Sequence, residues 1–486
     1  MADLEGSDES LKTQSPKISA EVFAIPLDAD RFLIYAPGRR AAFVGNSAIV
    51  NRLADLNEGT ANLISTASDE QLLEFLRRLE IVDAGPEPFP ITSFQGEPEP
   101  VSLTLFLTTA CNLRCTYCYA SAGDTPASFM SPEIAKRGID YVALNARRQG
   151  LTQFDITYHG GGEPTVHWKV MVDSLDYARG RGRALGLDVR AYTATNGVLS
   201  NSQVDWVIGN LSGASLSYDG LPSAHDQNRL TVLGQGSSER VVHTIRRFDD
   251  AGFPYGLRLT VTADQIASLP LSIEYICSNF KPRRIQVEPA YQLGRWAAGP
   301  SAESESFIAA FRAARAVAVG NGLDIFFSAA RVGHLSNHFC GVTQDTFALS
   351  PDGNVSACYE VFSEGSPWAD KFFYATPDPN SAGYRFDLDR LHRLRQQAVQ
   401  FRGFCSGCYA KWHCGGDCYH KSLAVNGDAE FAGTDRCHIT RELTKDQILE
   451  RISAAGGIFW HEPPGSARGV MEQSVEGGTR EESLTA

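Results

Sequence analysis

The chain has 486 residues, a hydrophobic fraction of 43% and a formal net charge of −13 at pH 7. This length predicts roughly two to four domains and allows a large buried core. The acidic balance argues against a nucleic-acid-binding protein, which needs a basic surface, and suits a soluble chain that repels its own copies.

The sequence pattern argues against both a membrane-spanning segment and a signal peptide. No apolar run approaches the ~20 residues that span a bilayer, and residues 1–17 lack the basic and apolar regions of a signal peptide. We therefore expect a cytoplasmic protein. In that reducing compartment, eleven cysteines are more typical of metal or redox sites than of disulfides.

The first part of the chain is predicted to hold a small domain at residues 18–90. Residues 1–17 before it are polar and are expected to be disordered, and residues 91–100 after it form a linker in a proline-rich stretch. Two strands followed by two helices indicate a winged-helix-like module. The strands are expected at Ala20–Leu27 and Arg31–Ala36, and the helices at Ser47–Leu56 and Asp69–Leu79.

Strands and helices alternate over residues 101–325. Six βα units in series predict an α/β fold with a parallel sheet and right-handed crossovers, a partial (β/α)6 barrel. In such barrels the chemistry lies at the carboxyl ends of the strands. The expected strands are Val101–Thr109, Phe154–His159, Val189–Thr195, Ala214–Tyr218, Tyr255–Thr262 and Ile285–Ala290. Helices are expected at Pro132–Gln149, Val166–Leu185, Glu239–Ala251 and Glu303–Val319.

The pattern changes after the barrel. Over residues 326–460 the helical periodicity fades and cysteines become dense, so we expect an irregular, cysteine-rich domain. Residues 461–486 are rich in Gly, Glu and Ser and are predicted to be a disordered tail. No internal repeat is visible.

The first cysteine group reads Cys111-Asn-Leu-Arg-Cys115-Thr-Tyr-Cys118 and follows the first barrel strand directly. Three thiolates at this spacing can converge on one iron–sulfur cluster and leave one iron open for a substrate or cofactor. The alternatives are zinc or unrelated buried cysteines. Structural zinc sites usually combine four ligands in paired C-x2-C spacing, which the first group does not have.

With Tyr117 before its last cysteine, this segment resembles the CxxxCxxC signature of the radical S-adenosylmethionine (SAM) superfamily. The resemblance implies that Cys111, Cys115 and Cys118 hold a [4Fe-4S] cluster whose open iron binds SAM. In that family, SAM is cleaved to a 5′-deoxyadenosyl radical, which abstracts a hydrogen from the substrate.

Further motifs follow at successive strand ends. Gly160-Gly-Gly-Glu-Pro164 resembles the family's GGEP motif, and Ser217-Tyr-Asp-Gly with His225-Asp-Gln-Asn-Arg229 resembles the S-x-D-G…H-D-x-x-R pattern of peptide-modifying members. The resemblance implies that GGEP contacts the SAM amino group and that Ser217 and Arg229 hold its carboxylate, a pairing suited to the planar fork of arginine. Read singly, each motif could be an ordinary turn. The implied cofactor-binding residues are Tyr117, Gly161, Gly162, Glu163, Thr195, Asn196, Ser217, Asp219 and Arg229.

Two charged residues after the sixth strand have two possible roles. Glu288 and Arg295 could line the site or form a core ion pair, and their sequence leaves both open.

The second cysteine group closely matches the SPASM extension of radical SAM enzymes, which carries two auxiliary [4Fe-4S] clusters. The alternative is one or two structural zinc sites, because C-x2-C is a common zinc half-site. The resemblance implies a first auxiliary cluster with three visible cysteine ligands and a second with four. These ligand sets are Cys340, Cys358 and Cys418 for the first, and Cys405, Cys408, Cys414 and Cys437 for the second. Cys277 stands apart and is expected to be a buried, inert thiol.

The family resemblance implies a maturase of peptides. The expected reaction is hydrogen abstraction from a residue of a precursor peptide, followed by an intramolecular C–C, C–O or C–S crosslink. Its partners would be a precursor peptide with a leader sequence, paired by strand addition to the N-terminal domain, and an electron donor such as flavodoxin or ferredoxin. The N-terminal domain could instead cap the barrel or mediate dimerisation.

Candidates for proton transfer lie next to an auxiliary-cluster cysteine. In sulfatase maturases an Asp follows the cysteine that corresponds to Cys358, whereas here Tyr359 and Glu360 follow it. This departure argues against formylglycine formation, and either residue could accept a proton or simply support the cluster. A protein maturase of the sulfatase or quinohaem type, a peptide epimerase, a small-molecule dehydrogenase and a non-catalytic iron–sulfur peptide scaffold remain alternatives.

Overall fold

The computed structural model describes residues 16–59, 66–89 and 91–460. Residues 1–15 and 461–486, which include most of the predicted disorder, lie outside these ranges. The described part divides into two compact units: residues up to 89 together with 445–460, and residues 91–444. Within the described ranges, no helix is both long enough and apolar enough to cross a membrane.

The first unit is built on a four-stranded antiparallel sheet in the order β1-β2-β3-β15. The predicted strands and helices form close to the expected positions, but the sequence pattern missed two strands. Of these, β15 comes from the far end of the described chain and pairs antiparallel with β3. The elements are β1 (Phe23–Pro26), β2 (Phe32–Ala36), β3 (Ala41–Gly45), β15 (Ile458–Trp460), α1 (Ser47–Glu58) and α2 (Ala67–Arg78).

The second unit contains an eleven-stranded mixed sheet in the order β10-β9-β8-β7-β6-β5-β4-β11-β12-β13-β14. The six predicted barrel strands are confirmed as neighbours that pair in parallel, in chain order. They are β4 (Ser102–Phe106), β5 (Gln153–His159), β6 (Asp188–Thr195), β7 (Gly213–Ser217), β8 (Tyr255–Val261) and β9 (Ile285–Pro289), and β10 (Ile325–Phe326) extends this edge.

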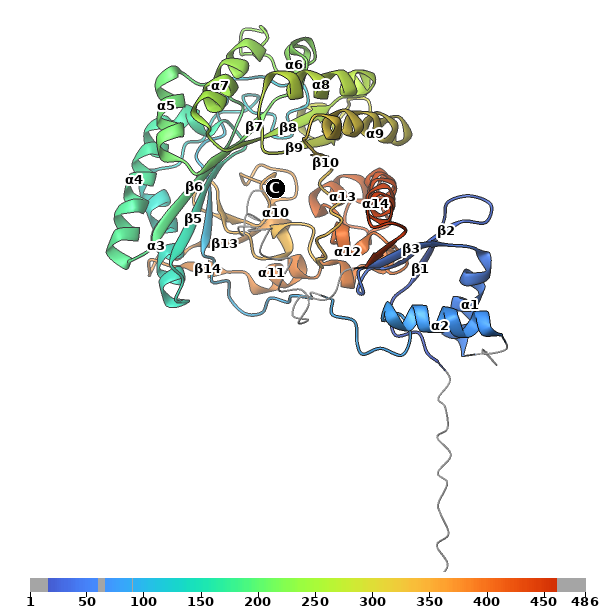
Figure 1. The fold of residues 1–486 in the computed structure, drawn as a ribbon. Coiled ribbons are helices and arrows are strands. Elements are labelled where there is room, and N and C mark those ends of the chain that lie inside the picture. The colour runs from blue at the N-terminus through green and yellow to red at the C-terminus, as the bar shows by residue number, and fades with distance from the viewer. Residues whose placement is uncertain (1–15, 60–65, 90, 461–486) are drawn as a thin grey trace, which may run out of the picture. The chain divides into compact units, whose positions relative to one another are not determined.

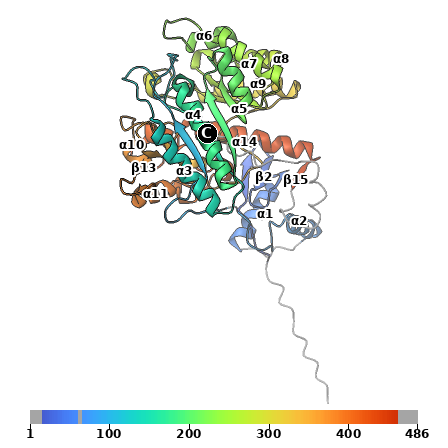
Figure 2. The ribbon, with the colours of Figure 1, turned by 90° about the vertical axis from the view of Figure 1, so that its left-hand side faces the viewer.

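The sheet curves, and its helices cover the outer side (Figure 1). Figure 2 views the molecule from that side, with α3, α4 and α5 in front of the strands. The large apolar core lies between these helices and the outward side chains of the strands, such as Leu105, Ile156 and Leu257. The helices are α3 (Pro132–Arg148), α4 (Trp168–Leu185), α5 (Asn201–Asn210), α6 (Pro222–Asn228), α7 (Ser238–Ala251), α8 (Leu269–Asn279) and α9 (Ser304–Gly320).

The cysteine-rich segment is more regular than its fading periodicity indicated. Its strand β11 pairs in parallel with β4, so this segment continues the barrel sheet. Helix α14 escaped prediction because its buried residues alternate between apolar side chains such as Leu443 and polar ones such as Thr440 and Thr444. The elements are β11 (Ala348–Leu349), β12 (Val355–Ser356), β13 (Phe373–Pro377), β14 (Tyr384–Phe386), α10 (Ala369–Phe372), α11 (Leu388–Arg395), α12 (Lys411–Cys414), α13 (Tyr419–Asn426) and α14 (Asp435–Ala454).

The predicted linker contains no helix or strand but is held by side chains of the second unit. Asn337 donates to the carbonyl of Thr92 at 2.8 Å, and Asn145 donates to the carbonyl of Pro100 at 3.0 Å. Buried side chains that satisfy backbone groups in this way fix an irregular segment in one conformation.

Candidate active site

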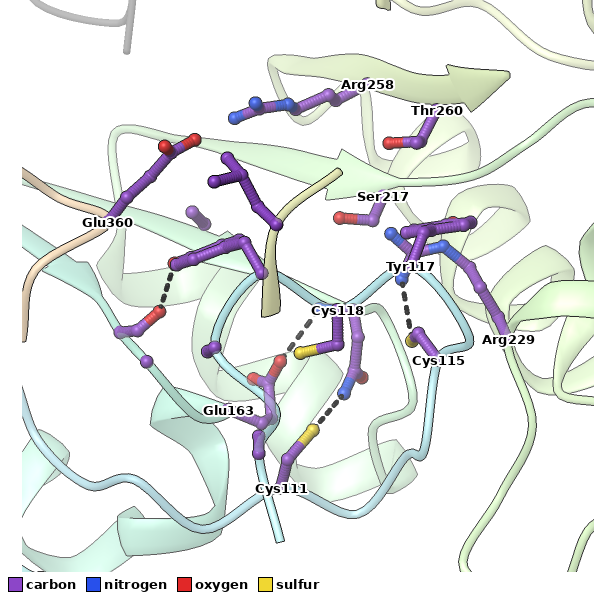
Figure 3. A pocket seen from close by; sticks show the side chains of 18 of the residues that line it. Cys111, Cys115, Tyr117, Cys118, Glu163, Ser217, Arg229, Arg258, Thr260 and Glu360 are labelled. Atoms are coloured by element: carbon purple, nitrogen blue, oxygen red, sulfur yellow. Dashed lines mark hydrogen bonds between the residues drawn. The ribbon is translucent and has the colours of Figure 1, made fainter. Parts of the chain in front are cut away.

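The first cysteine group forms a loop at the carboxyl end of β4, as the barrel pattern predicted. Cys111, Cys115 and Cys118 all line one cavity of about 210 Å³, and Figure 3 shows their side chains on one side of it. The loop is tied to segments that follow β7 and β9: the Thr116 N–H donates to the carbonyl of Asn228 at 2.9 Å, and the Arg295 guanidinium donates to the carbonyl of Cys115 at 2.6 Å.

The environment of these thiols fits an iron–sulfur cluster. Burial raises the pKa of Cys111 to about 12 and also raises the pKa of Cys115, so free thiolates are disfavoured at neutral pH. Bound iron would reverse this preference, because metals bind the thiolate form. Two donors already face the sulfurs: the Asn196 amide lies 3.7 Å from Cys111 Sγ, and the Arg229 guanidinium lies 3.8 Å from Cys115 Sγ. Such donors stabilise sulfur ligands that carry negative charge.

The glycine motif lies directly beside the cysteine loop. Gly160, Gly161 and Gly162 line the cavity. The Gly162 N–H donates to the carbonyl of Thr108 at 3.2 Å, and a Cβ atom on Gly162 would lie 2.1 Å from the carbonyl oxygen of Ala110. Only glycine therefore allows the two loops to approach this closely.

Glu163 connects the second and third strand ends. Its carboxylate accepts hydrogen bonds from the Thr195 hydroxyl at 2.9 Å and the Asn196 N–H at 2.8 Å. It is 2% exposed, and burial raises its pKa although these hydrogen bonds oppose the shift. Because Asn196 also faces Cys111, Glu163 sets the position of a side chain next to the cysteine loop. The structure thus brings Glu163, Thr195 and Asn196 together at the cavity.

Tyr117, Asp219 and Arg229 form a buried cluster on another wall. The Tyr117 hydroxyl donates to Asp219, whose carboxylate lies 3.3 Å from Arg229 Nε, and the Arg229 guanidinium lies over the Tyr117 ring. Tyr117, Ser217 and Arg229 line the cavity, whereas Asp219 does not. Asp219 therefore acts on the cavity through its two partners. In the described structure, Arg229 Nε has no aligned hydrogen bond, and Ser217 lies on the same wall, which fits a site for a carboxylate (Figure 3).

The later cysteines separate into two groups. Burial raises the pKa of Cys340 to about 12 with a further contribution from Cys418, and the pKa of Cys358 is raised by burial and by both of these neighbours. These three line a second cavity of about 110 Å³. The remaining four cysteines form the second group. Cys408 and Cys437 contribute to the raised pKa of Cys405, and Cys437 contributes to the raised pKa of Cys414. In the described residues, no three His, Cys, Asp or Glu side chains are placed as ligands of a single metal ion.

Cys277 lies on α8, and no other cysteine influences its pKa. It lines neither cavity and packs partly buried against the core.

Six residues line both cavities and form the wall between them. Sequence reasoning named two of these, Glu288 and Glu360, and missed four. The missed residues carry weak signals: His159 ends β5 just before the glycine motif, Arg258 is a polar position in an alternating strand, and Lys421 follows Cys418 by three positions. The six are Tyr119, His159, Arg258, Glu288, Glu360 and Lys421.

The two carboxylates of this wall are paired. Glu360 lies 2.7 Å from His420 Nδ1 and 3.3 Å from Lys421 Nζ. Burial would raise the pKa of Glu360, but Lys421 and His420 outweigh it and lower the pKa. Glu288 lies 3.0 Å from Arg436, which overcomes the effect of burial and lowers the Glu288 pKa to about 2. Both carboxylates are thus ionised at neutral pH.

Tyr359 lines the second cavity, whereas Arg295 supports the first cysteine loop. Tyr359 stacks on His159 with ring centroids 5.0 Å apart, and its hydroxyl accepts a hydrogen bond from the Thr104 hydroxyl at 3.4 Å. Arg295 pairs with Asp124 at 2.7 Å and binds carbonyls of the first cysteine loop, so it lines neither cavity.

Comparison with known proteins places this site in context. Residues 105–266 match the family model described as the radical SAM superfamily. The chain is 26% identical over 354 residues to the mycofactocin maturase MftC of Mycolicibacterium smegmatis, covering 68% of this chain and 82% of that protein. It is 23% identical over 392 residues to the pre-heme d1 synthase of Dinoroseobacter shibae, covering 73% of this chain and 89% of that one.

A solved structure shares the fold. Native anSMEcpe with bound AdoMet and Cp18Cys peptide matches with a TM-score of 0.56 and 16% sequence identity, covering 73% of this chain and 99% of that one. The likeness shows that the two chains share their fold.

Proposed function

Because the chain is a radical SAM enzyme related to SPASM-type peptide maturases, we propose that it abstracts a hydrogen from a residue of a precursor peptide and closes an intramolecular crosslink. One observation carries this proposal: the cavity beside Cys111, Cys115 and Cys118 and the cavity beside Cys340, Cys358 and Cys418 share a wall of six residues. A substrate held at that wall would contact both cysteine groups, so hydrogen abstraction and removal of the second electron could occur within one site.

The cysteines divide into the three cluster sites that this chemistry needs. Cys111, Cys115 and Cys118 would hold the cluster that binds SAM, and the two later groups would hold auxiliary clusters. When bound, the clusters and SAM supply electrons and the hydrogen-abstracting radical. The protein's own part is to orient: Ser217 and Arg229 suit the SAM carboxylate, and Glu163 fixes Asn196 beside Cys111.

The proton leaving the substrate needs an acceptor on the shared wall. Burial raises the pKa of Tyr359, which therefore stays protonated at neutral pH and cannot accept a proton. Glu360 is ionised, lines both cavities and is hydrogen-bonded to His420, through which a proton could pass. Of the two residues named from the sequence, Glu360 is the one we propose as proton acceptor.

The N-terminal unit is proposed to receive the leader peptide. Its antiparallel sheet ends in β1 on one side and in β15 on the other. Of these two edge strands, β1 is the one that we propose for strand addition, in which backbone hydrogen bonds provide affinity. Slower amide exchange in Phe23–Pro26 on adding a peptide encoded beside this gene would support this; unchanged exchange there would oppose it.

The central test is anaerobic. We would reconstitute the protein, count iron and sulfide, and measure 5′-deoxyadenosine formed from SAM with dithionite. Three four-iron clusters predict about twelve irons per chain, with product formed by the wild type and none by a Cys111/Cys115/Cys118→Ala triple variant. Bound zinc, or no SAM cleavage with the first cluster intact, would favour the peptide-binding scaffold instead.

A further inference from the structure

We propose that Arg258 and His159 form a binding subsite for a carboxylate of the substrate, at the wall shared by the two cavities. This inference rests on the proposed function, because it describes the peptide that the site accepts. It states that the residue placed beside the modified position carries an acidic side chain or is the peptide's carboxyl terminus.

The charged residues that line the two cavities nearly all have partners. Glu163 accepts several hydrogen bonds, Arg229 faces Asp219, Glu288 faces Arg436, and Glu360 faces Lys421. Arg331 donates to backbone carbonyls. Arg258 lines both cavities, and among the described residues no hydrogen bond or ion pair of its guanidinium is found. Its charge helps to lower the pKa of Glu288 and of Glu360, but neither carboxylate is hydrogen-bonded to it. A partly buried guanidinium without a hydrogen-bonded anion costs free energy that a bound carboxylate would recover.

The position of Arg258 follows from the strand that carries it. Along β8 the buried side chains alternate with half-buried ones, and Arg258 and Thr260 belong to the half-buried set that faces the site. Figure 3 shows the Arg258 side chain extending into the pocket on the side of Glu360. Since Lys421 already pairs with Glu360 at 3.3 Å, Arg258 is the cation of this wall that has no ion pair among the described residues.

His159 supplies a second donor on the same wall. Its Nδ1 accepts a hydrogen bond from the Gly160 N–H at 2.9 Å. Burial, with a contribution from Arg258, lowers the pKa of His159 to about 4. The ring is therefore neutral at pH 7, and because Nδ1 accepts, its proton lies on Nε2. In the described structure no partner of Nε2 is found, and the residue lines both cavities.

A carboxylate fits these two donors best. The planar fork of arginine binds a carboxylate through two parallel hydrogen bonds, and a neutral imidazole N–H can donate to the same group. The SAM carboxylate has its own candidate partners, Ser217 and Arg229, beside Cys115. Arg258 also lines the cavity of Cys340, Cys358 and Cys418, which neither of those two residues does. The anion that meets Arg258 is therefore assigned to the peptide.

The experiment measures binding to the reconstituted holoenzyme with SAM, anaerobically, by titration calorimetry. The probes are N-acetylglutamate α-amide and N-acetylglutamine α-amide for a side-chain carboxylate, and N-acetylalanine and its amide for a carboxyl terminus. We expect at least one carboxylate probe to bind about tenfold or more tightly than its amide, the effect of one charged, bidentate contact. Arg258→Gln should remove this difference, and His159→Gln should reduce it.

The matched control is Arg246→Gln, which removes an exposed positive charge from α7 and should leave the difference intact. Arg258→Lys keeps the charge without the planar fork and should show an intermediate preference for the acid over the amide. This variant also tests the proposal if Arg258→Gln fails to fold or to load iron. Equal binding of acids and amides by the wild type would overturn the proposal. So would a preference that persists in Arg258→Gln, or a parallel loss of SAM affinity, which would assign Arg258 to the cofactor. SAM cleavage by the wild type without any probe tests the proposed function separately.

Discussion

The carboxylate of Asp219 lies 3.3 Å from Nε of Arg229, and both side chains are almost completely buried. Asp219 also accepts the Tyr117 hydroxyl and the N–H of Thr260. It therefore fixes three residues of the cavity wall without lining the cavity itself.

Asp219→Asn should weaken SAM binding, because the buried guanidinium of Arg229 loses its counter-charge and its position. We expect the KM for SAM in the cleavage assay to rise about tenfold or more. The matched control is Asp155→Asn, which breaks a 2.8 Å pair with Arg190 that touches neither cavity. Equal effects of the two variants on KM would show that Asp219 is merely structural.

Gly162→Ala should disrupt the approach of the glycine motif to the cysteine loop. The new methyl group would lie 2.1 Å from the Ala110 carbonyl oxygen, so the backbone must move. We expect SAM cleavage to fall at least about tenfold, and Gly180→Ala provides the comparison. Gly180 lies in α4 with open space around it, and alanine there should raise stability by roughly 0.5–1 kcal/mol. Full activity of Gly162→Ala would contradict the packing argument.

Iron content should follow the three cysteine groups. The triple alanine variant of Cys340, Cys358 and Cys418, and the quadruple variant of Cys405, Cys408, Cys414 and Cys437, should each lose about four irons per chain. Cys277→Ala should lose none, since Cys277 lies apart from every group. Colorimetric iron and sulfide assays after gel filtration measure this. Loss of zinc in place of iron would point to structural zinc sites.

Tyr359 and Glu360 should respond differently to removal of their polar groups. Tyr359→Phe keeps the stack on His159 and loses one long hydrogen bond, so peptide modification should stay within about threefold of wild type. Glu360→Gln removes the proposed proton acceptor and should lower it about tenfold or more. Mass spectrometry of the peptide gives the rates. The reverse order would make the tyrosine the proton acceptor.

His159 should make stability depend on pH. Its pKa falls from 6.5 to about 4 on folding, so the unfolded chain binds more protons between these values and stability falls as pH drops below 6.5. His159→Gln removes this term. The melting temperatures of wild type and variant, measured anaerobically from pH 7.5 to 5, should therefore converge as the pH falls. A constant gap would mean that His159 keeps its ordinary pKa.

The sequence predicted those features that depend on local pattern and motif. Strands β4 to β9 were visible because buried parallel strands such as Leu103–Phe106 are short apolar runs between helical segments. The cysteine loop and the glycine motif could be recognised because a cluster site requires this cysteine spacing and the close approach of the two loops requires glycine. Arg258 was not, because only the curved sheet and the folded cysteine-rich segment show that it lines two cavities and has no ion pair within the described ranges.

The pairing of β15 with β3 has a consequence for how the chain is made. Strands β1, β2 and β3 are synthesised before residues 91–444, while Ile458–Trp460, which cover the outer edge of β3, are synthesised after them. Until then β3 presents unpaired N–H and C=O groups, and such an edge readily recruits strands from other chains. Closing it requires one of the longest-range contacts in the molecule, which slows folding. The newly made chain therefore passes through an incomplete state, whose exposed strand edge favours aggregation until β15 pairs with β3.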